Sequence, residues 1–244
     1  MKVLAVIPAR YASSRFPGKP LIDLKGKTMI RRVYEGVKRS SLISDVIVAT
    51  DDERIEQEVK SFGGKCIMTS ADHPSGTDRC GEVAAHFSEM DVVINVQGDE
   101  PLVDHLQLEQ LLHAFNDPET QIATLASRNI ALEDLDNPNR IKVVRDGREN
   151  AMYFSRSCIP NHFHSKGTPL ENYPYLRHIG LYAYRRETLL NLTQLDPTSL
   201  ERAESLEQLR WLYHGYQIKV VHTEIETPNI DVPEDVEKVL AVLG

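Results

Sequence analysis

The sequence predicts an α/β protein with a mostly parallel central sheet, helices on both faces, and a smaller antiparallel subregion inserted in its second half. Short apolar runs alternate with segments of helical spacing four times within the first 115 residues. Such βα repeats build parallel sheets that are covered on both faces. From about residue 122 strand-like segments follow one another, and helical spacing returns near residue 199.

The first half is predicted to contain four strands, each followed by a helix. The strands are short, largely β-branched apolar runs of the kind found in buried parallel sheets; they lie at 2–8, 45–50, 65–69 and 91–97. Apolar residues recur at helical spacing in the four intervening segments, at 28–40, 52–64, 77–87 and 105–115. The second helix is expected to end at Gly63-Gly64, because glycine commonly terminates helices.

The second half is predicted to be more antiparallel. Strands are expected at 122–127, 141–157 and 178–186, and Asp146-Gly147 is a turn signal for a hairpin within the second of them. A helix over 199–215, a strand over 217–225 and a closing helix with Pro233 at its start complete the chain. We therefore expect one domain over 1–244, with an inserted subregion at about 140–215.

The composition narrows the class of protein. The chain has 36 acidic and 28 basic residues, a formal net charge of -8, which argues against general binders of nucleic acid or membrane surfaces. Its three cysteines are scattered, as in proteins of reducing compartments. No apolar run is long enough to span a bilayer. We expect a cytoplasmic protein that binds no nucleic acid and does not insert into membranes.

A basic loop directly follows the first strand. The stretch "VLAVIPARYASSRFPGKPL" contains Arg10, Arg15 and Lys19, and the first acid of the chain is Asp23. Open parallel sheets bind ligands at the carboxyl ends of their strands, where this loop lies. Gly18 and the "GKT" at 26–28 lack P-loop spacing, and no dinucleotide fingerprint is present. The loop is either a phosphate-binding site of another type or a solvated basic turn.

Two acids are candidates for a metal site. Asp99 follows the fourth predicted strand in "VINVQGDEPL", where an oxygen ligand for Mg²⁺ would face the ligand-binding edge. It could also be an ordinary turn residue before a helix. Asp231 precedes the last helix in "PNIDVPEDVEKV" and could simply be its cap.

Seven segments resemble one enzyme family in sequence and in order. They are "IPARYASSRFPGKPL", "SGTDR", "VINVQGDEPL", "YFSR", "LRHIGLYAYR", "SLEQLRWL" and "IDVPEDVEKV". Together they cover nearly the whole chain and resemble the 3-deoxy-manno-octulosonate cytidylyltransferases. The resemblance implies a Rossmann-like nucleotidyltransferase fold, a homodimer, and Mg²⁺ as cofactor, and it assigns sugar binding and dimerisation to the inserted subregion at about 140–215. It further implies transfer of a cytidylyl group from CTP to 3-deoxy-D-manno-octulosonate (Kdo), with release of pyrophosphate, for lipopolysaccharide synthesis.

The same resemblance assigns roles to individual residues. The nucleotide is expected to contact Pro8, Ala9, Arg10, Arg15, Lys19, Ser75, Gly76, Thr77 and Arg79. Catalysis is assigned to Lys19, Arg10, Asp99 and Asp231, and the two acids are the expected metal ligands. The Kdo pocket is expected to contain Gln97, Arg156, His178, Tyr182, Glu207 and Gln208. Two positions depart from the family: Val232 replaces a frequent threonine, and Asn161 replaces a frequent tryptophan.

Other interpretations remain open at this stage. Residue type alone favours a structural ion pair for Arg156, the core for Tyr182 and a solvated helix face for Glu207. The acceptor could be another sugar acid, such as sialic acid or an amino-modified Kdo. A non-catalytic nucleotide-binding subunit is a further alternative, although such a protein would be expected to have lost Lys19, Asp99 or Asp231.

Overall fold

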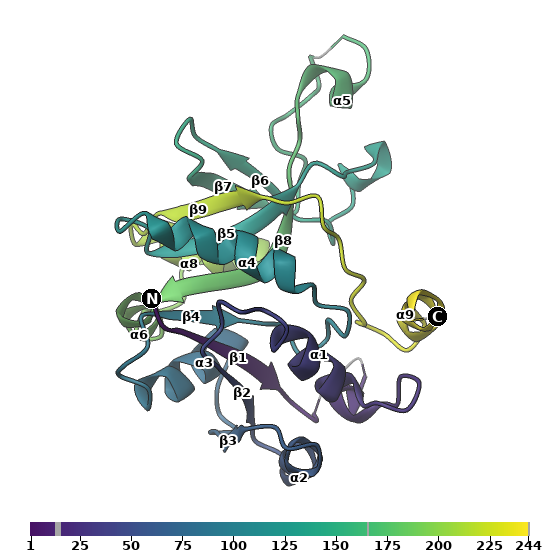
Figure 1. Ribbon diagram of the computed structural model, residues 1–244. Coiled ribbons are helices and arrows are strands. Elements are labelled where there is room, and N and C mark those ends of the chain that lie inside the picture. The colour runs from purple at the N-terminus through teal and green to yellow at the C-terminus, as the bar shows by residue number, and fades with distance from the viewer. Residues whose placement is uncertain (13–15, 165, 244) are drawn as a thin grey trace. The chain divides into compact units, whose positions relative to one another are not determined.

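The computed structural model describes residues 1–12, 16–164 and 166–243 (Figure 1). It contains two compact units. Unit 1 comprises Met1–Glu109, Ala183–Thr193 and Thr227–Gly244, and unit 2 comprises Gln110–Tyr182 and Gln194–Glu226. The predicted insertion at about 140–215 overlaps unit 2, and its roles in sugar binding and dimerisation stay predictions. Among the helices in the described ranges, none has the length and apolar character to cross a bilayer.

Unit 1 contains a parallel sheet of four strands in the order β3-β2-β1-β4 (Figure 1). The central strand β1 pairs in parallel with both of its neighbours, and β2 pairs in parallel with β3. Their bounds are β1 Val3–Ala9, β2 Asp45–Thr50, β3 Cys66–Met68 and β4 Val92–Asn95. The four predicted strands are therefore confirmed, and the carboxyl ends of β1 and β4 lie at the same edge.

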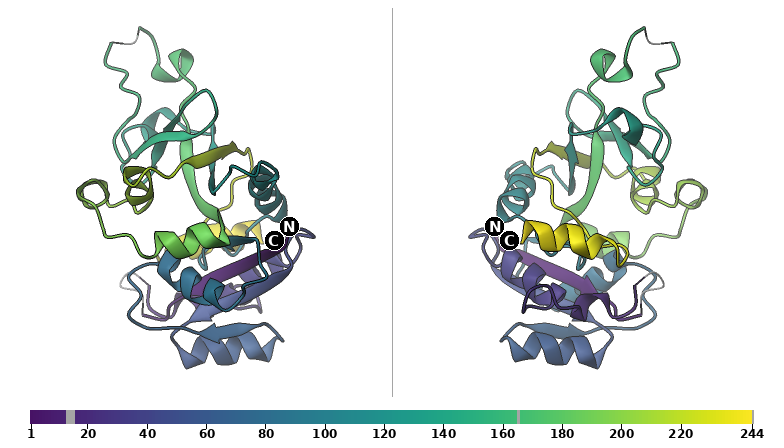
Figure 2. Two further views of the ribbon diagram at one scale, coloured as in Figure 1. Left: turned by 90° about the vertical axis from the view of Figure 1, so that its left-hand side faces the viewer. Right: turned by 90° about the vertical axis from the view of Figure 1, so that its right-hand side faces the viewer.

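Helices connect these strands. The chain adds β2 and β3 on one side of β1 and then crosses back to add β4 on the other side. Because βαβ crossovers are right-handed, α1 and α2 lie on one face of the sheet and α3 lies on the other. The helices of unit 1 are α1 Met29–Val37, α2 Glu53–Ser61, α3 Gly76–Ala85, α6 Arg186–Leu192 and α9 Asp235–Val242. In Figure 2 the yellow α9 lies beside the purple N-terminal region, where Val239 packs with Leu24 and Met29.

Unit 2 mixes parallel and antiparallel pairs. Its strands β8, β5 and β9 are neighbours in that order, with β5 parallel to β9, and β6 is antiparallel to both β7 and β8. The strands are β5 Ile122–Ser127, β6 Lys142–Arg145, β7 Ala151–Ser155, β8 Arg177–Arg185 and β9 Ile218–His222. The helices that begin within this part are α5 Pro169–Asn172, α7 Ser199–Glu204 and α8 Gln208–Tyr213. Both α4, His105–His113, and β8 have residues in each unit.

Three local predictions are refined by the structure. The hairpin at Asp146-Gly147 is present, but the left-handed residue of its turn is Glu149, with φ 64°. The helix predicted over 199–215 is interrupted at Ser205, whose φ of 52° cannot continue a helix. The last helix begins at Asp235 rather than at Pro233, and the Asp235 carboxylate accepts the amides of Asp231 and Val232 in the preceding turn.

Candidate active site

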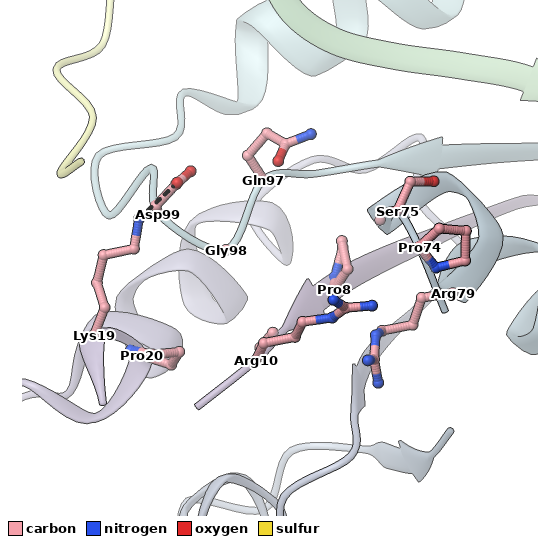
Figure 3. A pocket seen from close by; sticks show the side chains of 12 residues that line it. Pro8, Arg10, Lys19, Pro20, Pro74, Ser75, Arg79, Gln97, Gly98 and Asp99 are labelled. Carbon is pink, nitrogen blue, oxygen red and sulfur yellow. Dashed lines mark hydrogen bonds and ion pairs between the residues drawn. The ribbon is translucent and has the colours of Figure 1, made fainter. Parts of the chain in front are cut away.

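A cavity of about 290 Å³ lies at the carboxyl ends of β1 and β4 in unit 1 (Figure 3). This is the edge at which open parallel sheets bind ligands. Four separate stretches of unit 1, all before residue 100, meet there. The lining residues are Pro8, Ala9, Arg10, Lys19, Pro20, Pro74, Ser75, Gly76, Arg79, Gln97, Gly98 and Asp99.

Two cations of the basic loop line this cavity. Arg10 directly follows β1 and donates a hydrogen bond from Nη2 to the carbonyl oxygen of His73. Lys19 opens a short 3₁₀ helix, and the preceding Gly18 has φ 73°, a conformation that favours glycine. Figure 3 shows Lys19 pointing toward Asp99, away from Arg10. The third predicted cation, Arg15, lies outside the described residues.

The Lys19 ammonium group connects three distant segments of unit 1. It donates to Asp99 Oδ2 at 2.8 Å and to the carbonyl oxygen of Ile230 at 2.7 Å. The Ile230 amide in turn donates to the Asp99 carbonyl oxygen at 3.0 Å. The segment that carries Asp231 is thereby attached, through its neighbour Ile230, to the residue predicted as the other metal ligand.

The position of Asp99 depends on a close backbone approach. A Cβ atom at Gly98 would lie only 2.8 Å from the carbonyl oxygen of Pro8, so a larger residue would push the loop away from β1. On the other side of Asp99, Glu100 Oε2 is buried without a hydrogen-bond partner among the described residues. Burial, together with the neighbouring Asp99 charge, raises the pKa of Glu100 to about 8.

Asp231 does not cap the last helix. Its backbone amide donates to the Asp235 carboxylate at 3.1 Å, and the Val232 amide does so at 3.2 Å. The Asp231 carboxylate instead accepts from Asn229 Nδ2 at 2.7 Å. The N-cap position of α9 is Glu234, which forms no side-chain cap hydrogen bond, so Asp231 does not fill the capping role considered from the sequence.

The two acids suit a hard cation that brings further ligands with it. Mg²⁺ prefers oxygen ligands and is commonly bound by one or two carboxylates together with substrate phosphates. Within the described ranges, no group of three or more His, Cys, Asp and Glu side chains could hold a metal by itself. Asp99 and Asp231 thus fit a magnesium ion shared with a phosphate ligand better than a closed protein site.

The segment 75–79, which is expected to contact the nucleotide, forms the first turn of α3. Ser75 is the N-cap; its Oγ accepts from the Asp78 amide at 3.2 Å and donates to Asp78 Oδ2 at 2.7 Å. A Cβ at Gly76 would lie 3.3 Å from Pro8 Cγ, so this turn packs closely on β1. Thr77 is buried and does not line the cavity.

Arg79 is fully buried, although its side chain lines the cavity. Its Nη1 donates to Thr69 Oγ1, and Nη2 lies 3.5 Å from Asp51 Oδ2. No hydrogen-bond acceptor within the described parts of the chain meets Nε or Nη2. Burial lowers the pKa of Arg79, while the Asp51 charge opposes this shift. Asp51 is not among the residues predicted from the sequence, although its position directly after β2, at the ligand-binding edge, was a signal for it.

The residues predicted to bind the sugar acid, apart from Gln97, lie in unit 2. Arg156 donates from Nε to the Glu204 carbonyl at 2.7 Å, from Nη1 to the Pro138 carbonyl at 2.9 Å, and from Nη2 to the Ser205 carbonyl at 3.2 Å. It therefore holds the turn between α7 and α8. A guanidinium has five N–H donors, so two of them are not used by these three bonds.

Unit 2 also brings four of the predicted residues onto neighbouring elements. The His178 ring contacts the rings of Phe154 and Tyr182, with centroids 4.9 and 5.4 Å apart, and its Nε2 lies 3.0 Å from Thr124 Oγ1. Burial lowers the pKa of His178 to about 3 and raises the pKa of the Tyr182 phenol. Tyr182 packs edge-on against Trp211 of α8, the helix that Glu207 and Gln208 begin.

Comparisons with known proteins show the family of this chain. A family model described as Cytidylyltransferase matches residues 4–220. The 3-deoxy-manno-octulosonate cytidylyltransferase of Parabacteroides distasonis is 53% identical over 250 residues, covering 100% of this chain and 99% of that protein. The protein of the same name from Bacteroides thetaiotaomicron is 54% identical over 242 residues, covering 97% and 96% of the two chains.

A solved structure gives the same result. The CMP:2-keto-3-deoxy-manno-octonic acid synthetase complexed with CTP superposes with a TM-score of 0.92 at 46% identity, covering 100% of this chain and 98% of that one. This match confirms the predicted nucleotidyltransferase fold. The two relatives and the solved structure each cover at least 97% of this chain. The chain therefore belongs to the 3-deoxy-manno-octulosonate cytidylyltransferase family.

Proposed function

We propose that this protein transfers a cytidylyl group from CTP to Kdo, forming CMP-Kdo and pyrophosphate. The observation that carries the proposal is the cavity of unit 1, where Arg10, Lys19 and Asp99 meet at the carboxyl ends of β1 and β4. Cations beside a carboxylate are what a triphosphate with its magnesium ion requires. Membership of the family supports CTP and Kdo as the substrates.

The anomeric hydroxyl oxygen of Kdo attacks the α-phosphorus of CTP and loses its proton to water, while the bond from phosphorus to the pyrophosphate oxygen breaks in line. Arg10 and Lys19 offset the negative charge of the triphosphate, and Lys19 matters most as charge builds on the departing pyrophosphate. Asp99 and Asp231 would hold Mg²⁺. When bound, this ion supplies charge neutralisation and can lower the pKa of the attacking hydroxyl.

In this proposal Pro8, Ala9, Ser75, Gly76, Thr77 and Arg79 contribute to the nucleotide site, as does Arg15. Arg156 binds the Kdo carboxylate through the two N–H groups that are not used in its hydrogen bonds to backbone carbonyls. Gln97, His178, Tyr182, Glu207 and Gln208 contact the sugar hydroxyls. A specific pocket needs such polar partners, because only the correct sugar restores the hydrogen bonds to water that these groups lose on binding. We further propose a cytoplasmic homodimer that serves lipopolysaccharide synthesis.

The test is pyrophosphate release from each nucleoside triphosphate against a panel of sugar acids, with Mg²⁺ present. We expect release only with CTP and fastest with Kdo, and none from the Asp99→Asn variant. Rapid turnover of sialic acid or an amino-modified Kdo, with none of Kdo, would overturn the acceptor but leave cytidylyl transfer intact. Binding of CTP without turnover of any sugar acid would indicate a non-catalytic nucleotide-binding subunit.

A further inference from the structure

Tyr11, next to Arg10, closes the basic loop onto its far end. Its carbonyl oxygen accepts the Gly18 amide at 2.9 Å. Its ring packs against the same glycine: a Cβ atom at Gly18 would lie 3.1 to 3.3 Å from the nearest ring atoms and the hydroxyl. Gly18 directly precedes Lys19. The Tyr11–Gly18 contact therefore sets the separation of the backbone at Arg10 and at Lys19.

The Tyr11 ring also contacts a residue outside the loop. The Arg54 guanidinium carbon lies 3.2 Å from the ring centroid, close enough for a stacked cation–π contact. This guanidinium is itself fixed by Asp52, which accepts from Arg54 Nε at 2.9 Å and from Nη2 at 2.6 Å. Asp52 is the N-cap of α2 and also accepts the Arg54 amide at 3.0 Å.

The first turn of α2 thus presents a planar cation to the ring of Tyr11, although no residue of α2 lines the cavity. A bidentate carboxylate pair restricts the guanidinium to one plane, which lysine cannot reproduce. Within the described parts of the chain, Arg54 makes its hydrogen bonds with Asp52 and its ring contact with Tyr11, so its geometry supports a role in holding the tyrosine.

We propose that Arg54 is a positioning residue for the nucleotide: by stacking on Tyr11 it keeps the Tyr11–Gly18 contact closed and holds Arg10 and Lys19 at the spacing that the triphosphate needs. This inference rests on the proposed function. Loss of the stack should weaken CTP binding, since two cations that must be ordered on binding contribute less affinity than two already in place. Binding of the sugar acid should be unaffected.

The variants are Arg54→Ala, Arg54→Lys and Tyr11→Leu, with Tyr11→Phe to retain the ring. Lys60→Ala is the matched control, because Lys60 forms an exposed pair with Glu56 on the same helix, at 2.8 Å. We expect the first three variants to raise the KM for CTP about five- to tenfold, with KM for Kdo and the melting temperature nearly unchanged. Tyr11→Phe and Lys60→Ala should behave as the parent.

A second measurement does not depend on turnover. Hydrogen exchange of the Gly18 amide reports the Tyr11–Gly18 hydrogen bond directly, and we expect it to be about five- to tenfold faster in Arg54→Ala but not in Lys60→Ala. Unchanged Gly18 exchange and unchanged KM for CTP in Arg54→Ala would overturn the proposal. Faster exchange in a protein that does not turn over CTP would retain the positioning contact and reject the proposed function instead. Equal weakening of both substrates with a lowered melting temperature would assign Arg54 to the fold.

Discussion

Replacing Lys19 with methionine should reduce both the stability and the turnover of the protein. The Lys19 Nζ atom joins the basic loop to Asp99 and to Ile230, and the Lys19 and Asp99 side chains are 12% and 27% exposed. Fully exposed pairs contribute about 0–1 kcal/mol, whereas removing one partner of a buried pair costs about 3–5 kcal/mol. At intermediate exposure we expect Lys19→Met to lower the free energy of unfolding by about 2 kcal/mol.

A double-mutant cycle isolates the Lys19–Asp99 pair. Lys19→Met, Asp99→Asn and the double variant are compared by urea unfolding in metal-free buffer, followed by far-UV circular dichroism. We expect a coupling energy of about 1 kcal/mol. The control is Lys27→Met, which removes a more exposed pair with Glu35 and should cost under about 1 kcal/mol.

The same variant tests the catalytic role of Lys19. Turnover of CTP should fall about a hundredfold, or roughly 3 kcal/mol of transition-state stabilisation. Strictly additive unfolding energies would refute the coupling of Lys19 to Asp99. If Lys19→Met also matched Lys27→Met in turnover, the basic loop would be a solvated turn and not the triphosphate site.

Three further predictions concern Asp231 and the predicted sugar site. Asp231→Asn should lower turnover at least about a hundredfold, roughly 3 kcal/mol of transition-state stabilisation, with an unchanged circular dichroism spectrum. Normal turnover at saturating Mg²⁺ would show that Asp231 is not a metal ligand. Arg156→Ala should raise the KM for Kdo about 10- to 100-fold, and an equal loss of CTP affinity would contradict a sugar contact. Because the pKa of His178 is lowered from 6.5 to about 3, the folded state resists its protonation and stability should fall as pH drops below about 6.5. By pH 5 this loss should reach up to about 2 kcal/mol. Urea unfolding at a series of pH values should show a flatter dependence of stability on pH in His178→Gln, but not in the control His113→Gln. The same dependence in the parent and both variants would contradict the assignment to His178.

The strands and most helices of unit 1 could be predicted from the sequence. Buried parallel strands are continuous apolar runs, and the predicted strand at 2–8 is seen as β1 at Val3–Ala9, with all of its leucine, isoleucine and valine side chains fully buried. The position of Asp99 followed as well, because a residue that leaves a parallel strand at its carboxyl end faces the ligand-binding edge. Burial and chain direction are encoded locally, so local patterns were sufficient.

The interruption between α7 and α8 could not be predicted in this way. The segment 199–215 has helical spacing throughout, and nothing in its residue types requires Ser205 to leave the helix. In the structure the Glu204 and Ser205 carbonyls are both taken by Arg156, which comes from the end of β7. A contact from another part of unit 2 thus competes with helix propensity, and tertiary contacts regularly override so weak a preference.

By itself, the sequence determined the elements of this protein, the edge of the sheet that binds ligands, and the family. Only the tertiary structure decided which charged groups meet: Lys19 with Asp99 and Ile230, Arg79 with Asp51, and Arg54 with Tyr11. Elements follow from local burial and spacing, because each residue contributes to them through its near neighbours along the chain. The contacts of these charged groups follow from strand order and loop closure, which bring together residues as much as 211 positions apart.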